Sequence, residues 1–333
     1  MHAKTVDSTL IACRASKYAA LILLASISCL DFQFESEYED INGLHIEHVH
    51  SYSFVGTKIL FNGSMGYIAN AESLLVYDFT EVDAAVYLGY YAAYNSINDF
   101  QICDNCAVLV TDTGIEIVDI SDSLPNQLSA VPMFFFGGSV KIDNDNAYVV
   151  SPNQLHVVDI SDRQNPTLTN SYAFNDNIRQ VEIDSNFAYV LVGTDFWVLN
   201  VQNPSVIIPI DSTSLPALDI FHPEAFFKKG SFIYFASYTT FAAWLSTCEL
   251  TLNKDTQVLN HIVVPDRVRK FHMSDEYTLA VSWYAAFLIN LRYPTSPCIS
   301  EETGFGGIDG TIRDDYIFLL TPNLVIFEIK QVE

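Results

Sequence analysis

The chain has 333 residues, of which half are hydrophobic and 17% are charged, so it can form a large packed core and is not intrinsically disordered. Its formal net charge of −24 excludes nucleic acid as a partner, because binding to phosphates depends on clustered Lys and Arg. The 23 Phe and 18 Tyr residues favour β-strands.

An apolar run, YAALILLASIS, occupies residues 18–28 and follows the basic residues Lys4, Arg14 and Lys17. It is too short to span a bilayer and is typical of a secretory signal peptide. Small residues end the run and Cys29 follows directly, as in the signal peptides of bacterial lipoproteins. We therefore predict a signal peptide at 1–28 and, if it is of the lipoprotein type, lipidation of Cys29. The acidic residues 29–43 would then form a tether.

A repeated pattern fills the rest of the chain. Short β-forming runs recur every 39–45 residues, each followed after a few turn-type residues by a second apolar run. The first runs are GYIAN (66–70), AVLVT (107–111), AYVVS (147–151), AYVLV (188–192), IYFAS (233–237), TLAVS (278–282) and IFLLT (317–321). The second runs are LLVYDF (74–79), IEIVDI (115–120), LHVVDI (155–160), FWVLNV (196–201), AAWLSTC (242–248), AAFLINL (285–291) and LVIFEI (324–329).

Two further strands complete each repeat. An inner strand precedes the first run, as in SVKIDN (139–144), and an outer strand follows a Ser-Asp and proline turn, as in TLTNSYAF (167–174). Four strands per repeat of about 40–45 residues indicate an all-β fold, a β-propeller. Seven four-stranded blades fit best, and six or eight stay open because repeats five to seven are degenerate.

The two ends of the propeller region, residues 44–333, predict how the ring closes. After the last apolar run only four residues remain, too few for an outer strand. Residues 44–54, LHIEHVHSYSF, precede the first blade and have no blade of their own. We therefore expect this N-terminal strand to pair into the last blade and so close the ring.

The runs IEIVDISD and LHVVDISD, preceded by AVLVTDTG and AYVVSPNQ, resemble the LVIVD repeat family. The resemblance is good over residues 97–210, fair in the first repeat, and only a pattern from 211 onward. It implies a β-propeller of an exported or surface-associated bacterial or archaeal protein. It implies no activity, because the signature residues of the family are structural.

A ligand site is expected at the mouth of the central channel, where loops lead into the inner strands. The longest of these loops, LPALDIFHPEAFF (215–227), carries a His and acids, and aromatic residues follow in a later turn. The candidate ligand-binding residues are His222, Glu224, Arg267, Arg269, Trp283, Tyr284 and Asp309. Eight basic residues fall in or beside inner strands and predict a cationic channel mouth: Lys58, Lys141, Arg179, Lys228, Lys229, Arg269, Lys270 and Arg313. Ordinary ion pairs with nearby acids are the alternative reading.

Other chemistry has weak support. Cys103 and Cys106 flank a two-residue turn, where a hairpin disulfide is plausible in an exported protein, and a second CxxC pair for zinc is missing. His48 and His50 are two residues apart on a strand without a third ligand, so we predict no metal and no cofactor. Nucleophile elbows and phosphate-binding glycine loops are absent from the sequence.

These observations predict a monomeric, exported propeller in the bacterial cell envelope that acts as a non-catalytic binding or scaffold module for a surface protein or glycan. Contact with the membrane would come only through the N-terminal lipid. The alternative is a hydrolase or lyase that uses His222, Glu224 and channel residues. An enzyme should place one His and two acids within hydrogen-bond reach at the channel mouth, whereas a scaffold should disperse them.

Overall fold

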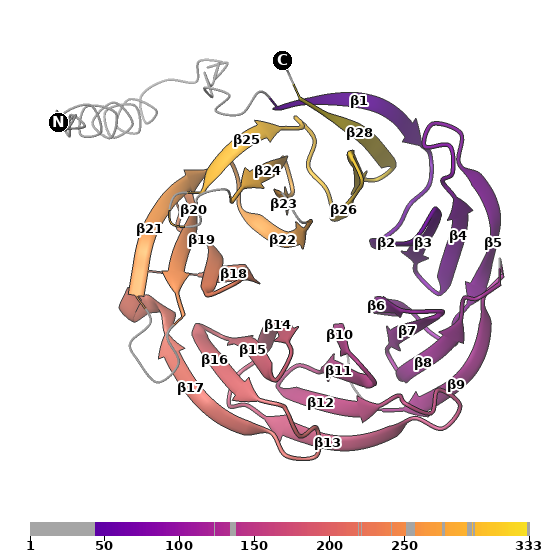
Figure 1. The fold of residues 1–333 in the computed structure, drawn as a ribbon, viewed down its shortest axis with the longest axis horizontal. Helices are drawn as coiled ribbons and strands as arrows, with labels where there is room; N and C mark the ends of the chain where they lie inside the picture. The colour runs from indigo at the N-terminus through magenta and orange to yellow at the C-terminus, as the bar shows by residue number, and fades with distance from the viewer. Residues whose placement is uncertain are drawn as a thin grey trace, which may run out of the picture. The chain divides into compact units, whose positions relative to one another are not determined.

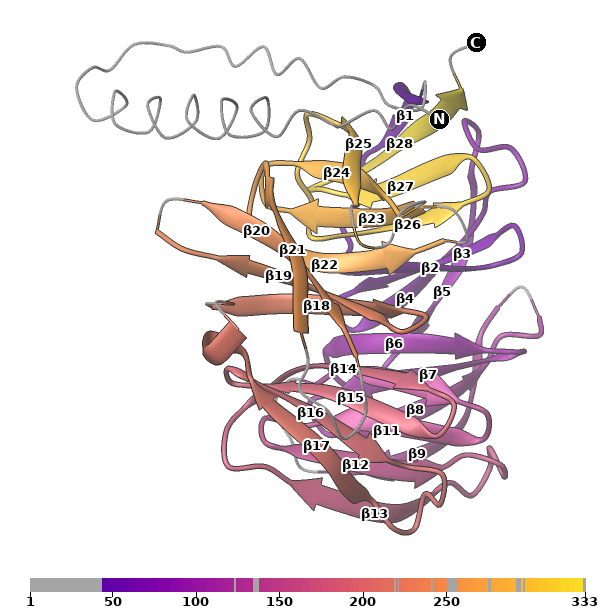
Figure 2. The same ribbon diagram turned by 60° about the vertical axis from the view of Figure 1, so that its left-hand side comes forward.

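Seven four-stranded antiparallel sheets are arranged radially around a central axis, as the blades of a β-propeller are (Figures 1 and 2). The computed structural model describes residues 44–331 except 123, 134–137, 219, 221, 241, 251–256, 275–276, 292–294 and 296. The predicted seven-bladed propeller is confirmed. The predicted signal peptide, Cys29 and the acidic tether lie outside the described residues.

Each blade runs from an inner strand at the channel to an outer strand at the rim. Blade 1 contains β2 (Lys58–Asn62), β3 (Met65–Asn70), β4 (Ser73–Asp78) and β5 (Val86–Ala92). Blade 2 contains β6 (Ile97–Cys103), β7 (Cys106–Thr111), β8 (Gly114–Asp119) and β9 (Asn126–Pro132). Blade 3 contains β10 (Val140–Asp143), β11 (Asn146–Val150), β12 (Gln154–Asp159) and β13 (Thr167–Ala173). Blade 4 contains β14 (Ile178–Asp184), β15 (Phe187–Val192), β16 (Asp195–Asn200) and β17 (Ile208–Ser214).

The last three blades follow the same order. Blade 5 contains β18 (Pro223–Lys229), β19 (Phe232–Tyr238), β20 (Ala243–Glu249) and β21 (Gln257–Val264). Blade 6 contains β22 (Val268–Met273), β23 (Tyr277–Ser282), β24 (Ala286–Asn290) and β25 (Cys298–Glu302). Blade 7 contains β26 (Asp309–Arg313), β27 (Tyr316–Leu320), β28 (Leu324–Gln331) and, as its outer strand, β1 (Leu44–Tyr52).

The core lies between neighbouring blades. The second and third strands are covered on both faces, which is why their sequences are almost continuously apolar; all six residues of β7 are buried. Apolar side chains of the described residues form seven clusters, one for each pair of neighbouring blades, including the pair of blades 7 and 1. The blade repeat in the sequence is therefore a repeat of these interfaces.

The duplicated DISD segments form the turn that leaves the third strand. Asp119 and Asp159 each accept a hydrogen bond at Oδ1 from the amide two residues on, at 2.8 Å in both blades. Asp78 and Asn200 do the same in blades 1 and 4, at 2.8 and 2.9 Å. The Asp that ends the third strand therefore caps this turn, which explains why the chain repeats it.

The ring is closed by the N-terminal strand, as predicted. β1 pairs antiparallel with β28, in a register that places Ile46 opposite Ile329 and Tyr52 opposite Leu324. A bulge between His48 and His50 interrupts the pairing. Closure from both ends of the chain leaves blade 7 with four strands and joins it to blade 1, where β26 lies beside β2.

The long loop before blade 5 contains one 3-10 turn, η1 (Leu215–Leu218), in which Leu215 is buried. Within the described ranges, no helix has the length and apolar character needed to cross a membrane.

Candidate functional site

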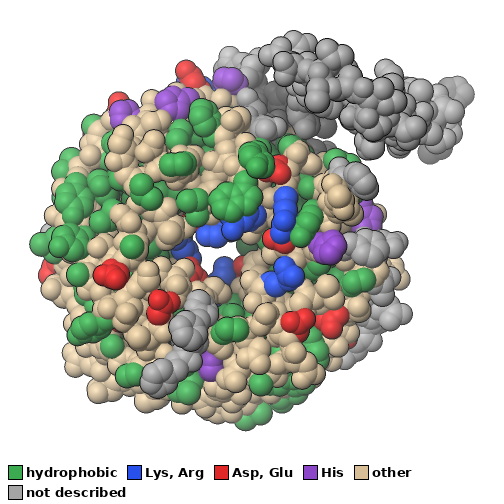
Figure 3. Space-filling view, turned by 180° about the vertical axis from the view of Figure 1, so that it is seen from behind, with side chains coloured by type: hydrophobic (Ala, Val, Ile, Leu, Met, Phe, Trp, Pro, Cys, Tyr) green, Lys and Arg blue, Asp and Glu red, His purple; other side chains and the backbone are tan. Residues whose placement is uncertain are grey.

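The inner strands place charged side chains around the channel. Side chains alternate along a strand, so residues such as Ile59, Phe100 and Val140 are buried between blades while their neighbours face the channel. The inner strands carry eight basic and six acidic residues, a net charge of +2 in a chain whose net charge is −24. Figure 3 shows Lys and Arg side chains gathered around the channel opening on one face.

Ion pairs between neighbouring blades hold much of this charge. Lys58 lies 2.7 Å from Asp99, and Lys141 lies 2.9 Å from Glu182. Burial in the channel would lower the pKa of Lys141, but the Glu182 carboxylate outweighs it and raises that pKa above its ordinary value. The alternative reading of the basic residues as structural ion pairs therefore holds for Lys58 and Lys141.

Asp309 is the most buried charge of the channel. Its carboxylate is 1% exposed and lies 3.1 Å from Nζ of Lys270 and 2.9 Å from Nε2 of His272. Its second oxygen accepts a hydrogen bond from the Ile59 amide of blade 1, at 3.1 Å. Burial alone would raise the pKa of Asp309, but His272 and Lys270 reverse this and hold the pKa well below its usual range.

Asp99 makes the equivalent contact in blade 2, where it accepts a hydrogen bond at Oδ2 from the Val140 amide at 2.8 Å. Both aspartates oppose the fourth residue of the adjacent first run, Val110 for Asp99 and Leu320 for Asp309. A carboxylate at this position therefore joins one blade to the next. Its role is structural in both blades.

A row of charges lies at the channel mouth, which we define as Arg179, Glu224, Arg267 and Arg269, where β14, β18 and β22 begin. Glu224 forms an ion pair with Nη2 of Arg267 and lies 3.7 Å from Nη1 of Arg179. The glutamate is 17% exposed, whereas the two arginines are 44% and 43% exposed. One carboxylate thus lies between two solvent-accessible guanidinium groups.

Aromatic rings support two of the guanidinium groups. The Arg267 guanidinium carbon lies 3.7 Å from the centroid of the Tyr238 ring, and that of Arg269 lies 3.9 Å from the Trp283 ring. His222 contacts the same tyrosine, with ring centroids 5.2 Å apart. Stacking fixes the plane of a guanidinium group and leaves its N–H donors at the edges.

The turn that carries Trp283 and Tyr284 is held from two sides. Oδ2 of Asp266 accepts a hydrogen bond from the Tyr284 amide at 3.1 Å. Gly306 packs so closely that a Cβ there would lie 1.9 Å from the Trp283 carbonyl oxygen. The side chains remain accessible, since Trp283 is 57% and Tyr284 is 80% exposed.

The structure thus brings together five of the seven predicted ligand-binding residues in two contacts. In the first, Arg267 forms an ion pair with Glu224 and stacks on Tyr238, which His222 also contacts; in the second, Arg269 stacks on Trp283. The other two are placed differently: Tyr284 points into solvent, and Asp309 is buried in its structural ion pair. The contact of Arg179 with Glu224 cannot be predicted from local sequence patterns, because it joins residues 45 positions apart on two different blades.

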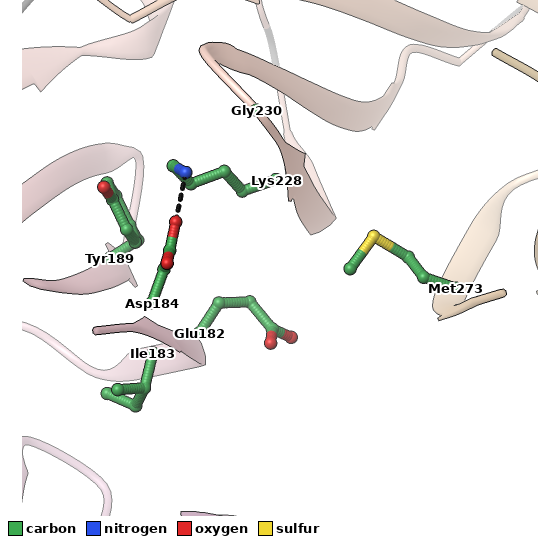
Figure 4. A pocket seen from close by; sticks show the side chains of 7 residues that line it. All are labelled: Glu182, Ile183, Asp184, Tyr189, Lys228, Gly230 and Met273. Carbon is green, nitrogen blue, oxygen red and sulfur yellow. Dashed lines mark hydrogen bonds and ion pairs between the residues drawn. The ribbon is translucent and has the colours of Figure 1, made fainter. Parts of the chain in front are cut away.

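A small pocket lies at the opposite end of the channel, where β14, β18 and β22 finish (Figure 4). Its volume is about 170 Å³, below the 300–1,000 Å³ typical of small-molecule sites. Lys228 forms an ion pair with Asp184 and lies 5.2 Å from the Tyr189 ring, and Glu182 and Met273 also line the pocket. Its charged lysine is already paired, so this pocket is a weaker candidate than the channel mouth.

Cys103 and Cys106 are far from the channel mouth in the fold, at the β6–β7 hairpin, where they lie opposite each other. Both are free thiols in the structure, and a hydrogen bond to Cys106 lowers the pKa of Cys103. Their disulfide therefore stays a prediction. Cys248, a free thiol buried in blade 5, lies on a different blade from Cys298.

The chemistry of the channel mouth is that of ion recognition. Glu224 is ion-paired with Arg267, and Asp309 is buried in its own ion pair. These two acids therefore do not form the set of one His and two acids, with His222 as the His, that is expected of an enzyme. Among the residues that the structure describes, no group of three His, Cys, Asp or Glu side chains could hold a metal ion.

Comparison with known proteins confirms the repeat. Residues 137–173, which contain the four strands of blade 3, match the family described as the LVIVD repeat. No curated protein sequence matches the chain.

Solved structures with similar folds are distant in sequence. The WD40 domain of Toxoplasma gondii coronin is 8% identical with a TM-score of 0.67, and the match covers 88% of this chain and 87% of that one. The WD40 domain of Neurospora crassa Pan2 is 10% identical with a TM-score of 0.64, covering 86% and 98%. A functionally unknown protein from Desulfotomaculum acetoxidans is 14% identical with a TM-score of 0.60, covering 77% and 88%. At these identities the similarity shows the fold alone.

Proposed function

We propose that this LVIVD-repeat propeller is a non-catalytic binding module, exported and tethered to the surface of a bacterial cell, which holds a surface protein or glycan at its channel mouth. The observation that carries the proposal is the row of half-exposed arginines beside exposed aromatic residues in an otherwise acidic protein. Arg, Trp and Tyr are the residues most enriched in the energetic centres of binding interfaces.

The state of the acidic groups supports binding over catalysis. A general acid or base needs a carboxyl or imidazole group that can reach a substrate. Asp309 is buried and ion-paired, and Glu224 is held by two arginines. Propeller folds commonly mediate protein interactions, which agrees with a partner that is itself a macromolecule.

Export and tethering are supported by the basic, apolar and small residues of 1–28 and by the Cys that follows them. Cells that express the full chain with a C-terminal tag would be fed a clickable palmitate analogue and then treated with protease while intact. The proposal expects label on the wild type, none on Cys29→Ser, and protease cleavage without lysis. Protection of the tag until lysis would contradict the surface location.

The binding face can be tested in the same cells. A photo-crosslinking amino acid at Tyr284 would be compared with one at Leu168, which is 50% exposed on the rim strand β13. We expect one dominant adduct from position 284 and none from 168. Equal labelling at the two positions would show that the channel mouth is not the binding face.

A further inference from the structure

We propose that the channel mouth recognises the carboxylate side chains of a short acidic segment of a partner protein, through the stacked guanidinium groups of Arg267 and Arg269. This inference rests on the proposed function and names the chemistry of its ligand.

The two guanidinium groups are arranged for this task. Arg267 lies on Tyr238 at 3.7 Å and Arg269 lies on Trp283 at 3.9 Å, so each presents a fixed plane. The residue between them, Val268, is 2% exposed, whereas Arg267 is exposed and Arg269, at a bulge in the strand pairing, is only partly buried. Both arginines are therefore accessible to a ligand. A planar guanidinium group with free edges can bind a carboxylate through two parallel hydrogen bonds.

Glu224 shows how a carboxylate meets this surface. It bonds Arg267 and lies 3.7 Å from Arg179, so the protein's own carboxylate occupies part of the site. Arg269 differs, because the described residues give it no acidic partner. A ligand carboxylate can therefore bind Arg269 directly and compete with Glu224 for Arg267.

The stacked rings favour a peptide over an acidic sugar. Tyr238 covers one face of Arg267 and Trp283 covers one face of Arg269, so a ligand carboxylate must approach along the edges of the two guanidinium groups. Glu and Asp carry their carboxylates on flexible stems, whereas a uronic acid carries its carboxylate directly on the ring. The ring would then have to enter beside Trp283, one face of which Arg269 already covers.

Overall charge limits the length of the ligand. A net charge of −24 repels a long polyacid, but at physiological salt charges act over only about 8 Å. Two or three carboxylates at the mouth then experience mainly the nearby arginines. We therefore expect a short acidic cluster, not an extended acidic chain.

The test is isothermal titration calorimetry of the full chain with the capped peptide Gly-Ser-Glu-Glu-Glu-Ser-Gly, at about 150 mM salt. Its Gln counterpart and trigalacturonate are titrated in parallel. The variants are the double change Arg267→Gln and Arg269→Gln, the single change Glu224→Gln, and Arg163→Gln as a control. Arg163 pairs with the 85% exposed Asp104, away from the channel mouth.

We expect the Glu peptide to bind at least tenfold more tightly than the Gln peptide. The double arginine change should remove this difference, and Arg163→Gln should leave it intact. Glu224→Gln should tighten binding about three- to tenfold, because it frees Arg267. If Glu224 had only a structural role, its replacement would not increase the affinity for the Glu peptide.

Weaker binding in Glu224→Gln, or equal binding of the Glu and Gln peptides, would overturn the inference. Binding of trigalacturonate without the peptide would also overturn it and assign a carboxylated glycan. If no anion binds while the crosslink at position 284 persists in cells, the carboxylate chemistry is wrong and the proposed function stands. If the peptide binds but no adduct forms in cells, the carboxylate chemistry of the channel mouth is correct and the proposed function fails.

Discussion

Replacement of Asp309 tests the reasoning about the channel most directly. The carboxylate is 1% exposed and joins three partners: Lys270, His272 and the Ile59 amide. The last of these contacts crosses from blade 7 to blade 1, where the two ends of the chain meet. Asp309→Ala removes all three contacts, whereas Asp309→Asn keeps an oxygen that can accept from Ile59 but loses the charge.

The expected magnitudes follow from burial. Removal of one partner of a buried ion pair costs about 3–5 kcal/mol, and the lower end applies here because Lys270 is 41% exposed and can be rehydrated. Asp309→Ala should therefore lower the free energy of unfolding by about 3 kcal/mol. Asp309→Asn should lower it by about 1–2 kcal/mol, the loss expected of a charge-assisted hydrogen bond.

The assay is urea unfolding followed by circular dichroism at several pH values. The pKa of Asp309 in the folded protein lies below the ordinary value of 3.8, so its contribution is complete above about pH 4 and is lost as the pH falls further. The stability of the wild type should then fall more steeply below pH 4 than that of Asp309→Asn.

The matched control is Asp104→Asn, at an 85% exposed carboxylate paired with Arg163. Asp104 has a φ of 48°, which Asn also tolerates, so the change should alter stability by less than about 0.5 kcal/mol. Equal effects of Asp309→Asn and Asp104→Asn, or an unchanged acid slope, would refute the assignment of Asp309 as a blade-joining charge.

Three further changes probe closure and packing. Deletion of Leu44–Tyr52 leaves the outer edge of β28 without a partner, so we expect loss of the monomer peak in size-exclusion chromatography. A monomer with unchanged melting temperature would contradict closure by β1. Glu116→Ala should lower the free energy of unfolding in urea by about 2–3 kcal/mol, because the carboxylate of the 2% exposed Glu116 accepts a hydrogen bond from the Tyr91 hydroxyl at 2.6 Å. A change of less than about 0.5 kcal/mol would refute a stabilising role for this hydrogen bond. Gly306→Ala should lower the free energy of unfolding by about 1–3 kcal/mol and weaken binding of the Glu peptide, because the new Cβ would collide with the Trp283 carbonyl. Unchanged stability in urea unfolding would show that the turn can shift freely.

Charged residues of the channel lie in two kinds of surroundings that sequence alone does not separate. Lys58, Lys141 and Lys270 are paired with acids of neighbouring blades and stabilise the ring. Arg267 and Arg269 lie against aromatic rings at the mouth, where solvent reaches them. The same residue class is therefore structural within the channel and available for recognition at its end.

The architecture could be predicted from the amino-acid sequence, because each blade is built from local patterns. Apolar runs mark strands that are covered on both faces, Asp119 and Asp159 cap amides two residues away, and the unpaired segment 44–54 had only one incomplete blade to join. Because these patterns recur along the chain, the blades can be recognised even where a single repeat is degenerate.

The partners of the charged residues, in contrast, depend on contacts that form only in the folded ring. Contacts such as Asp309 with Ile59, 250 positions apart, and Arg179 with Glu224 join different blades, and their side chains meet through the curvature of the ring. The pattern of one strand gives the face on which a side chain lies but not the neighbour across the next interface. For that reason Asp309, expected at the ligand site, is a buried ion pair between blades, while Arg179, expected at the channel mouth, has Glu224 of the next blade as its neighbour there.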